Sequence, residues 1–412
     1  MPDKQKHNHI PALRFPDFAN DGEWEVKRLG EIAERITRKN RSNHQLLVLT
    51  NSATEGVVNQ QDYFDREIVT RDNLTNYHII ELDDFVYNPR ISVAAPVGPI
   101  SRNKVGLGIM SPLYTIFRFK EGNFDFFEQY FRTNCWHQYL KDKANFGARF
   151  DRMNISSEDF MNLPIPFPPL AEQQRIAACL SAADEMINAT NGKLEQLKAY
   201  KKGLMQNLFN QRGGVINNIN NQIIGRLRFP EFYNEKEWEE KKLGEFITTI
   251  SPTKKLQSGE YKSEGSFPIV DQSQSYICGY SDDVEAVVNT TSENLIVFGD
   301  HTCTLKFVDF PFIQGADGIK IFKPSNSDEI DERFLYQALL FSPIVSKEYK
   351  RHFSELKEQV VCYPKELKEQ RKIASCLSTM DDQINAYTEK VALLEQYKKG
   401  LMQRMFPQNK II

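Results

Sequence analysis

The side chains of this 412-residue chain that could carry out chemistry do not complete a catalytic motif. The tetrapeptide Tyr87–Arg90 comes near the Asn-Pro-Pro-aromatic motif of adenine methylases, but Arg90 stands where the motif has its second proline. Gly106-Leu107-Gly108 is a lone Gly-x-Gly, and the chain has no Gly-x-x-x-x-Gly-Lys-Ser/Thr loop for ATP. His301 and Cys303 supply two zinc ligands where a site needs four. We therefore expect that the chain has no catalytic site, no cofactor and no metal ion. Its role would be binding, and partner proteins would carry out the reactions.

Basic and amide side chains gather in loops of the first half of the chain. Arginine donates two hydrogen bonds to guanine, asparagine and glutamine pair with adenine, and lysine and serine bind phosphates. Clusters of these types therefore predict DNA contacts, with a solvated loop as the alternative for each. The candidates in the first half are Arg35, Arg38, Lys39, Asn40, Arg90, Ser92, Arg102, Asn103, Lys104, Arg149 and Arg152.

The second half contains fewer arginines and more glutamines among its candidates. A glutamine-rich set would suit adenine edges. The candidates there are Lys254, Lys255, Gln272, Gln274, His301, Thr302, Lys306 and Lys357.

The net charge argues against a protein that binds along DNA through an overall positive charge. The formal net charge of the chain is −3, residues 31–168 carry 16 basic and 17 acidic side chains, and residues 245–365 carry 12 and 18. Affinity must then come from a local basic face and from partners, so we expect weak DNA binding by the chain alone.

The sequence contains an internal repeat, and the repeated segments indicate which elements hold these loops in position. Leu13–Pro16 recurs as Leu227–Pro230, and Tyr200–Gln206 recurs unchanged as Tyr397–Gln403. The opening blocks are 214 residues apart and the closing blocks 197. The centres between them, about 31–168 and 245–365, give no convincing alignment. Tandem duplication with drift would blur all parts alike, so constant frames around divergent centres indicate an exchanged recognition surface.

The closing blocks predict two long helices. Apolar residues follow alternating steps of four and three, as in a coiled coil, with only Lys398 breaking the second seam. One such helix could pack on its own domain, but two matched helices are better explained by packing on each other, and a pseudo-twofold arrangement of similar halves makes them antiparallel. The expected seam residues are Ile176, Leu180, Ile187, Leu194, Leu197, Leu204, Ile373, Leu377, Ile384, Val391, Leu394 and Leu401.

The centres predict short strands, each set followed by a helix. Strands are expected at 46–49, 84–87, 114–119, 267–270, 294–298 and 318–322, and helices at 125–140 and 332–341. The fold class is therefore α/β (α+β): two globular domains separated by a pair of long antiparallel coiled-coil helices, with a pseudo-twofold repeat. The expected parts are a first domain 1–168, helix 169–210, linker 211–224, a second domain 225–365 and helix 366–408.

This layout resembles the specificity (S) subunit of type I restriction-modification systems over nearly the whole chain. The segments that carry this resemblance are LRFPDF, EWEVKRLGEI, LPIPFPPLAEQQRIAACLS and KKGLMQNLF. Their second copies are LRFPEF, EWEEKKLGEF, KEQRKIASCLS and KKGLMQRMF. Ser111–Tyr114 and Gly147–Arg149 in the first centre also fit. The second centre lacks a Ser-Pro-Leu-Tyr segment, which suggests another subtype of recognition domain.

The resemblance implies two target-recognition domains that each read half of a split, asymmetric sequence in double-stranded DNA, with the helices setting the spacing. It also implies two methyltransferase (M) subunits, which methylate adenine, and nuclease-translocase (R) subunits, which cleave. The coiled-coil flanks and the frame motifs around Trp24 and Trp238 could dock the two M subunits equivalently, although a core role for both tryptophans is equally plausible.

Other classes remain as alternatives. A fused restriction-methylation enzyme is disfavoured by the missing methylase motifs, and a duplicated coiled-coil scaffold leaves the divergent centres unexplained. A specificity subunit that serves a methylase without an active nuclease fits equally well. The polar N-terminus and the lack of a long apolar stretch lead us to expect a cytoplasmic protein with no membrane partner, and six cysteines without a Cys-x-x-Cys pair suggest packing roles.

Overall fold

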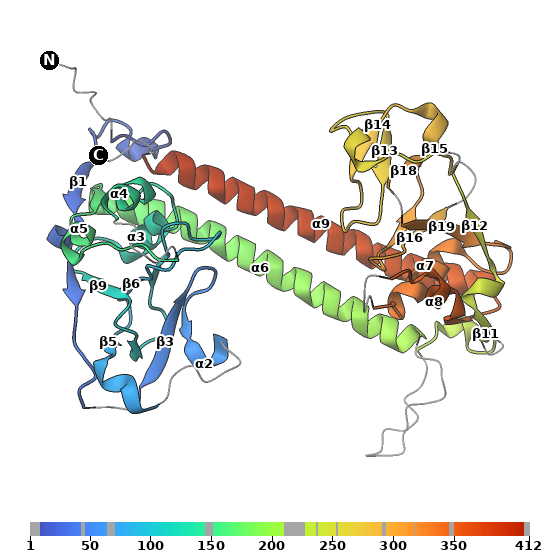
Figure 1. Cartoon of the computed structure of the whole chain (residues 1–412), viewed down its shortest axis with the longest axis horizontal. Helices are drawn as coiled ribbons and strands as arrows, with labels where there is room; N and C mark the ends of the chain where they lie inside the picture. The colour runs from blue at the N-terminus through green and yellow to red at the C-terminus, as the bar shows by residue number, and fades with distance from the viewer. Residues whose placement is uncertain are drawn as a thin grey trace. The chain divides into compact units, whose positions relative to one another are not determined.

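The structure is a computed structural model that describes residues 9–42, 46–63, 71–144, 151–209, 227–235, 238–252, 254–290, 294–316, 318–345 and 350–407. The candidate Arg149 and the expected linker 211–224 lie outside these residues. The chain divides into two compact units (Figure 1). Unit 1 comprises residues 1–190 and 390–412, and unit 2 comprises residues 191–389.

Unit 1 is built on two four-stranded sheets, ordered β2-β9-β6-β7 and β4-β3-β8-β5. A two-stranded sheet pairs β1 with β10. Its elements are β1 Glu25–Arg28, α1 Leu29–Ile32, β2 Ala33–Ile36, β3 Leu47–Ser52, β4 Gly56–Asn59, α2 Gln60–Tyr63, β5 His78–Ile80, β6 Phe85–Tyr87, β7 Ile100–Arg102, β8 Gly108–Met110, β9 Thr115–Phe119, α3 Phe124–Phe131, α4 His137–Lys143, α5 Ser157–Met161 and β10 Pro164–Phe167.

Unit 2 has the same plan. Its sheets are ordered β12-β19-β16-β17 and β14-β13-β18-β15, and β11 pairs with β20. Its elements are β11 Glu239–Lys242, β12 Ile247–Ile250, β13 Phe267–Val270, β14 Gly279–Ser281, β15 Val287–Val288, β16 Leu295–Gly299, β17 Leu305–Val308, β18 Phe312–Gln314, β19 Ile319–Pro324, α7 Glu332–Phe341, α8 Phe353–Glu358 and β20 Val360–Tyr363.

The two centres match strand by strand although their sequences do not align. The row across the first sheet of unit 1 reads Ile36, Ile116, Val86 and Ser101. The corresponding row of unit 2 reads Ile250, Ile321, Val297 and Lys306. In each second sheet one central pair, β3·β8 or β13·β18, is parallel. The missing Ser-Pro-Leu-Tyr segment therefore leaves the strand order of unit 2 unchanged, and the expected α/β class with an internal repeat is confirmed.

Most of the expected strands are present within a residue or two, but the helix expected at 125–140 is wrong as a single element. It is two helices, α3 and α4, separated at residues 132–136. The Thr133 hydroxyl donates to the carbonyl of Tyr130 at 2.6 Å, and the Trp136 indole donates to the carbonyl of Phe131 at 3.1 Å. These bonds take carbonyls that a continuing helix would use, and they let Trp136 enter the core.

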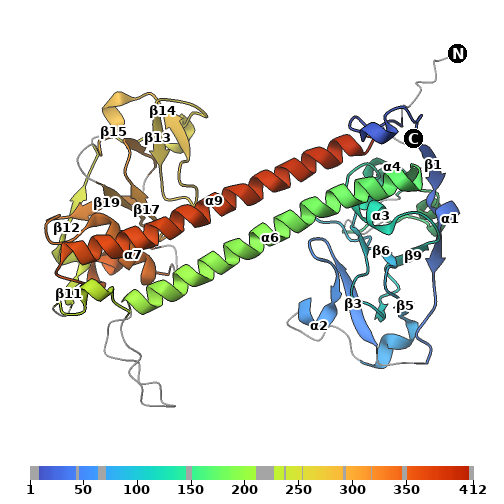
Figure 2. The ribbon, with the colours of Figure 1, turned by 180° about the vertical axis from the view of Figure 1, so that it is seen from behind.

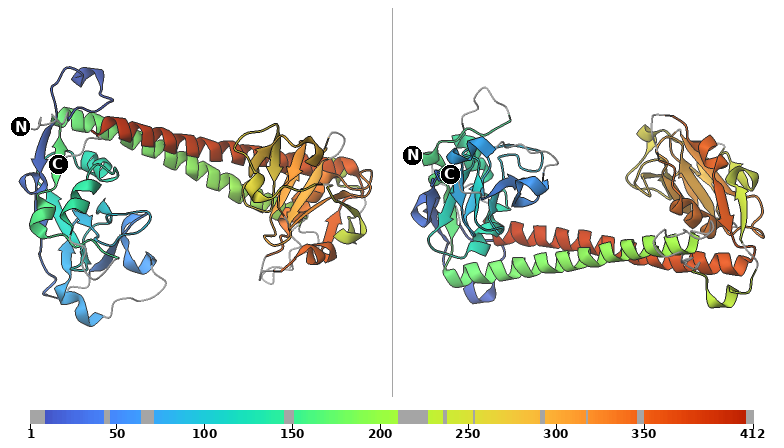
Figure 3. Two further views of the ribbon diagram at one scale, coloured as in Figure 1. Left: turned by 45° about the horizontal axis from the view of Figure 1, so that its top comes forward. Right: turned by 90° about the horizontal axis from the view of Figure 1, so that it is seen from below.

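The two long helices are α6 Leu170–Phe209 and α9 Leu367–Met405, and each contributes one part to each unit. In unit 1, Ile176 and Leu180 of α6 pack in one core with Leu401 and Met405 of α9. In unit 2 the opposite ends meet, because Leu208 of α6 packs near Ile373, Ala374 and Leu377 of α9. The segments are therefore antiparallel within each unit (Figure 3). All twelve expected seam residues are buried or half-buried. Their pairing along a coiled-coil seam stays a prediction.

A buried carboxylate near the start of each long helix holds the repeated opening motif. Both Glu172 oxygens accept from the Arg14 guanidinium at 2.7 Å, and the Trp24 indole donates to the same carboxylate at 3.1 Å. Unit 2 repeats the arrangement with Glu369, two 2.7 Å bonds from Arg228 and a 3.3 Å bond from Trp238. Trp24 is also buried in the core of unit 1. The core role expected as one of two alternatives is thus observed for Trp24, while the half-buried Trp238 packs against the core of unit 2.

The next residue of each long helix binds the recognition domain. Gln173 accepts from the backbone N–H of Asn123, which caps α3, and donates to the carbonyl of Pro168, both at 2.8 Å. Gln370 accepts from the backbone N–H of Asp331, which caps α7, at 2.8 Å and donates to the carbonyl of Pro364 at 2.7 Å. A Glu-Gln dipeptide therefore fixes the opening motif, the long helix and a domain helix against one another.

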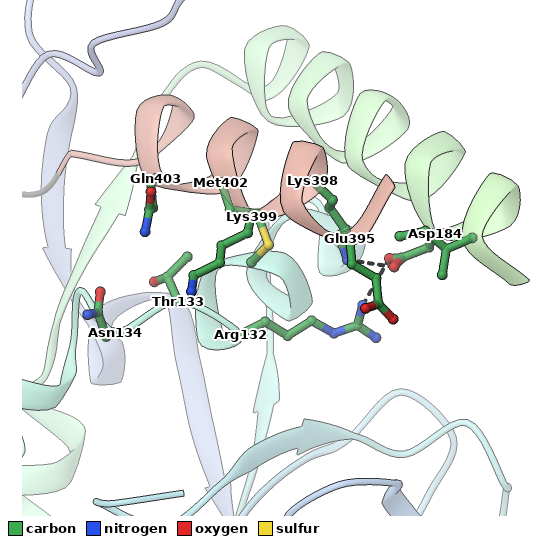
Figure 4. Close-up of a pocket in the computed structure, with 10 residues that line it drawn as sticks. Arg132, Thr133, Asn134, Asp184, Glu395, Lys398, Lys399, Met402 and Gln403 are labelled. Carbon is green, nitrogen blue, oxygen red and sulfur yellow. Dashed lines mark hydrogen bonds and ion pairs between the residues drawn. The ribbon is translucent and has the colours of Figure 1, made fainter. Parts of the chain in front are cut away.

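The lysine that breaks the predicted seam forms an ion pair. Lys398 of α9 binds Asp184 of α6 at 2.6 Å, and Arg132, directly after α3, donates to the other oxygen of Asp184 at 2.9 Å (Figure 4). Gln129 of α3 donates to that second oxygen, also at 2.9 Å. The pair lines a cavity of about 440 Å³. Burial opposes ionisation of Asp184, but the hydrogen bonds from Lys398 and Gln129 hold its pKa below the ordinary value.

Unit 2 contains the same pair with the helices exchanged. Lys201 of α6 binds Asp381 of α9 at 2.5 Å, and Gln337 of α7 donates to the other oxygen at 2.8 Å. Figure 2 shows the three helices α6, α7 and α9. Since ammonium and carboxylate meet only in one register, these pairs favour the antiparallel alignment over shifted ones.

We predict that Asp184→Ala destabilises the chain by about 2 kcal/mol, because it leaves the Lys398 ammonium in the interior without its carboxylate. The double variant Asp184→Ala/Lys398→Met should lose less than the sum of the single variants, measured by urea denaturation. Since the folded pKa of Asp184 is depressed, its contribution should persist above the ordinary carboxyl pKa and be lost as pH falls through the folded value.

The matched control is Lys198→Met, which removes an exposed lysine paired with Glu195 on the same helix turn. It should change the free energy of unfolding by less than about 0.5 kcal/mol. Additive losses in the double variant would show that Asp184 and Lys398 do not stabilise each other.

Candidate nucleic-acid interface

In unit 1 the loops that follow β3 and β6 are joined by amide side chains. Asn88 donates to the carbonyl of Asn51 at 2.9 Å, and Asn51 donates to the carbonyl of Val86 at 2.8 Å. Asn88 also accepts from the backbone N–H of Arg90 at 3.0 Å, which orients the residue after the strand. Both asparagines are buried, whereas Arg90 is exposed.

The segment 151–153 lies against this loop. Backbone bonds run from Met153 to Pro89 at 2.9 Å and from Ile91 to Asp151 at 3.0 Å, and Arg90 and Arg152 form a bridge. The exposed Ser92 follows in a turn closed by bonds between Ser92 and Ala95. Arg90, Ser92 and Arg152, expected from separate parts of the sequence, are therefore brought together.

Unit 2 brings four of its candidates together at the ends of β13 and β16. The Thr302 hydroxyl donates to the carbonyl of Gln272 at 2.7 Å, and Gln274 donates to the hydroxyl of Thr304 at 3.3 Å. His301 contacts the carbonyl of Lys350 through Nδ1 at 3.2 Å. The backbone at Gly318 has φ +84°, and a Cβ there would meet His301 and Gln272 within 3.0 Å. Only glycine lets this third loop approach so closely.

Strand register places the two clusters at the same position of the repeated fold. Val86 and Val297 occupy equivalent places, so Arg90 and His301 each stand four residues beyond an equivalent strand residue. The pairs Val48–Ile109 and Ile269–Ile313 likewise make Asn51 the counterpart of Gln272. In both units the carbonyl of this residue accepts a hydrogen bond from the loop after β6 or β16. One scaffold position thus presents arginine in unit 1 and histidine with glutamines in unit 2.

Several expected contacts of unit 1 are instead engaged with its own acids or lie inside. Arg102 binds Asp83 and Asp125 at 2.6 Å each, and Lys104 binds Glu128 at 2.8 Å. Asn103 is fully buried, with its amide on the carbonyls of Glu81 and Gly106. We therefore leave this segment out of the candidate interface.

A further basic segment follows β2. Arg35, Arg38 and Lys39 are exposed, Arg38 binds Glu81 at 3.4 Å, and Asn40 is buried. Burial lowers the pKa of the neighbouring His78, and the charges of Arg35 and Lys39 lower it further. A positive field therefore surrounds this segment, as phosphate binding would require.

In unit 2 the lysine candidates are tied to other groups. Lys254 binds Asp283 at 2.5 Å, and Lys357 lies 5.7 Å from the centre of the Phe353 ring. Lys255 also interacts with a neighbouring group through a hydrogen bond or an electrostatic contact. Lys306 is buried with 4% of its surface exposed, and it donates to backbone carbonyls. Lys306 therefore supports a loop from inside.

The sequence missed the polar residues that join the loops. Asn51 gave no signal because it lies within a strand, and Asn88 was considered only as part of a failed methylase motif. The Thr50 and Tyr114 hydroxyls, 3.0 Å apart, connect β3 to the segment before β9. Polar residues at the ends of apolar strands were the available signal.

The described residues offer neither a metal site nor a membrane-spanning helix. Within the described ranges no group of three or more His, Cys, Asp or Glu residues could hold a metal ion. None of the described helices is long and apolar enough to cross a membrane. The six cysteines, all within the described residues, form no disulfide with one another and are each of intermediate burial.

Comparison with known proteins gives consistent matches. A family model described as the type I restriction modification DNA specificity domain matches residues 21–199 and 235–396. The type I restriction enzyme MjaVIII specificity subunit of Methanocaldococcus jannaschii is 24% identical, over 97% of this chain and 94% of that protein. A putative MjaX specificity subunit of the same organism is 26% identical over 66% of this chain and 64% of that protein.

A solved structure shares the fold. The crystal structure of a type I restriction-modification S subunit from M. genitalium superposes with a TM-score of 0.63 at 16% identity, covering 97% of this chain and 99% of that one.

We predict that Arg90→Gln and Arg152→Gln each weaken binding to duplex DNA by about tenfold, because each removes a donor pair from the joined loops of unit 1. Fluorescence anisotropy at low ionic strength measures the affinity. Arg102→Gln is the control, since that guanidinium is engaged by Asp83 and Asp125, and it should change affinity less than about twofold. The reverse pattern would place the interface on the Arg102 segment.

Proposed function

The chain belongs to the family of type I restriction-modification specificity subunits, with two recognition domains, and we propose that it reads a bipartite, asymmetric DNA target. Each unit reads one half-site. Adenine methylation is then carried out by partner methyltransferase subunits, and cleavage by partner nuclease-translocase subunits. A specificity subunit that serves a methylase without an active nuclease remains the alternative.

One observation supports the assignment of two different half-sites. The same strand ends present different side chains in the two units, Arg90 and Arg152 in unit 1 and Gln272, Gln274 and His301 in unit 2. Arginine prefers guanine acceptors, and glutamine pairs with adenine. Two non-identical surfaces on one scaffold fit a target whose halves differ.

The charge distribution supports DNA binding in which partner subunits supply much of the affinity. Lys104, Arg102 and Arg118 are paired with acids of their own domain, which reduces the number of cations that can neutralise phosphates. Because phosphate contacts supply much of the affinity of DNA-binding proteins, we assign much of the affinity to the methyltransferase partners. Sequence choice is assigned to this chain.

The absence of a recognisable catalytic motif supports a non-catalytic role. The Tyr87–Arg90 segment that came nearest to a methylase motif has a structural part instead, since Asn88 joins two loops and is buried. We propose that the chain binds no cofactor of its own and acts in the cytoplasm, where its DNA target is found.

The identical heptapeptides offer equivalent docking points for two copies of one partner. Tyr200 is 65% exposed and Tyr397 is 63% exposed, each within Tyr-Lys-Lys-Gly-Leu-Met-Gln. The lysine that follows each tyrosine is buried in its ion pair, so the aromatic ring stands on a fixed helix face. We propose that each tyrosine contacts one methyltransferase subunit.

Exchanging residues 31–168 for the centre of another family member should change one half-site and leave the other unchanged. The reason is that the frame residues, including Arg14, Trp24 and Glu172, lie outside the exchanged segment. Methylome sequencing of cells with the original and exchanged genes gives both half-sites. A simultaneous change in both halves would rule out two independent readers.

Tyr200→Ser and Tyr397→Ser should each weaken one of two methyltransferase contacts by about tenfold, since tyrosine is a frequent interface anchor. Native mass spectrometry should then find mainly one bound methyltransferase for each single variant and none for the double variant. Tyr233→Ser is the control, because Tyr233 is 63% exposed but stands where the first copy has Ala19. Equal loss in the control would exclude a specific role for the repeated tyrosines.

A further inference from the structure

Lys306 is a buried ammonium that holds a loop by its backbone. The residue lies in β17 with 4% of its surface exposed. Its Nζ donates to the carbonyl of Asp271 at 2.7 Å and to that of Ser275 at 2.5 Å. The two carbonyls stand four residues apart in the loop between β13 and β14, so one side chain closes this loop.

Other bonds within the loop complete its shape. The Asp271 carboxylate accepts from the backbone N–H of Ser273 at 2.8 Å and from the Cys278 thiol at 2.7 Å. The carbonyl of Gln272 accepts from Thr302. The carbonyls of residues 271, 272 and 275 are all taken by protein donors, while the side chain of Gln274 is exposed. The backbone is thus turned inward at each end of the Gln272–Gln274 segment.

A buried lysine is costly unless it is well bonded, so its position needs a reason. Burial lowers the pKa of Lys306, and the neighbouring Cys278 and Asp271 act in the opposite direction. Ammonium offers three donors, and two of them close the loop. An apolar side chain of similar length would fill the space but leave both carbonyls without their donor.

Unit 1 makes the same connection with different chemistry. Register places Ser101 of β7 where unit 2 has Lys306, because Ser101 pairs with Val86 and Lys306 pairs with Val297. Serine is too short to reach the loop backbone. There the Asn51 amide, near the end of β3, reaches the carbonyls of Val86 and Pro99, at 2.8 and 3.3 Å, and ties the end of the strand to the β6–β7 hairpin. Both units therefore link the end of β3 or β13 to the neighbouring hairpin, although they share no residue for the purpose.

We propose that Lys306 is a positioning residue that holds Gln272 and Gln274 for base reading in the second half-site. The inference rests on the function proposed above and changes the expected role of Lys306 from a DNA contact to a support behind one. Fixing a loop before binding reduces the ordering cost of each base contact and keeps an amide in bidentate geometry.

The test uses Lys306→Met in the complete complex with its methyltransferase subunits. Methylation is measured on a DNA library with every single-base change in both half-sites. We expect discrimination at one or two adjacent base pairs of the second half-site to fall by about tenfold, with the first half-site unchanged. Lys262→Met is the matched control, because Lys262 is an exposed lysine of unit 2 paired with Asp282, and it should leave both half-sites as in the original.

A purely structural role predicts a different pattern. Lower methylation of all sequences in proportion, with base preferences retained, would overturn the proposal. If Lys306→Met does not yield soluble complex, Lys306→Gln replaces it, since its amide can still fill the site but cannot donate to both carbonyls in the same way. If the original complex shows no sequence preference that depends on this chain, the proposed function itself fails, and that outcome is distinct from a failure of Lys306 alone.

Discussion

The structure depends on a carboxylate buried near the start of each long helix. Glu172 and Glu369 are fully buried, and a carboxylate in that position is stable only with charged and hydrogen-bonding partners. Arg14 and Trp24 supply them in unit 1, and Arg228 and Trp238 in unit 2. Because the adjacent glutamine caps onto α3 or α7, the same turn of helix also fixes the recognition domain.

That constraint explains why the frame can be constant while the centres diverge. The buried bonds that orient each domain lie between the opening motif, the helix start and one domain helix, and none involves the loops at the strand ends. Those loops are joined by bonds to backbone carbonyls, such as that of Asn51 or Gln272, which any residue possesses. The donors of these bonds are the side chains of Asn88 and Thr302, so the exposed side chains that do not donate them can change without loss of the scaffold.

Ion pairs within the first domain engage several of its basic side chains. Arg118 binds Asp84 and Glu81, and Arg102 binds Asp83 and Asp125, so these arginines stabilise the fold and are not a free basic surface. Sequence clustering alone could not separate such cations from Arg90, because the acids that engage them lie elsewhere along the chain. Among the described candidates, Arg90 follows the buried strand β6 and forms a bridge with Arg152. In unit 2 His301 and Thr302 follow the buried strand β16, and Thr302 binds the carbonyl of Gln272.

The sequence by itself determined the repeat, the two long helices and their seam, because heptad spacing and identical heptapeptides are local patterns that need no tertiary information. It also marked Lys398 as the break in the seam, but only the structure showed that Lys398 forms an ion pair with Asp184. The structure also showed the equivalent ion pair of Lys201 with Asp381 in unit 2. The common strand order of the centres, the break between α3 and α4, and the burial of Asn103 and Lys306 were likewise decided by tertiary structure. The reason is physical: strand pairing and the partner of a buried charge depend on residues distant in sequence, which spacing along the chain does not contain.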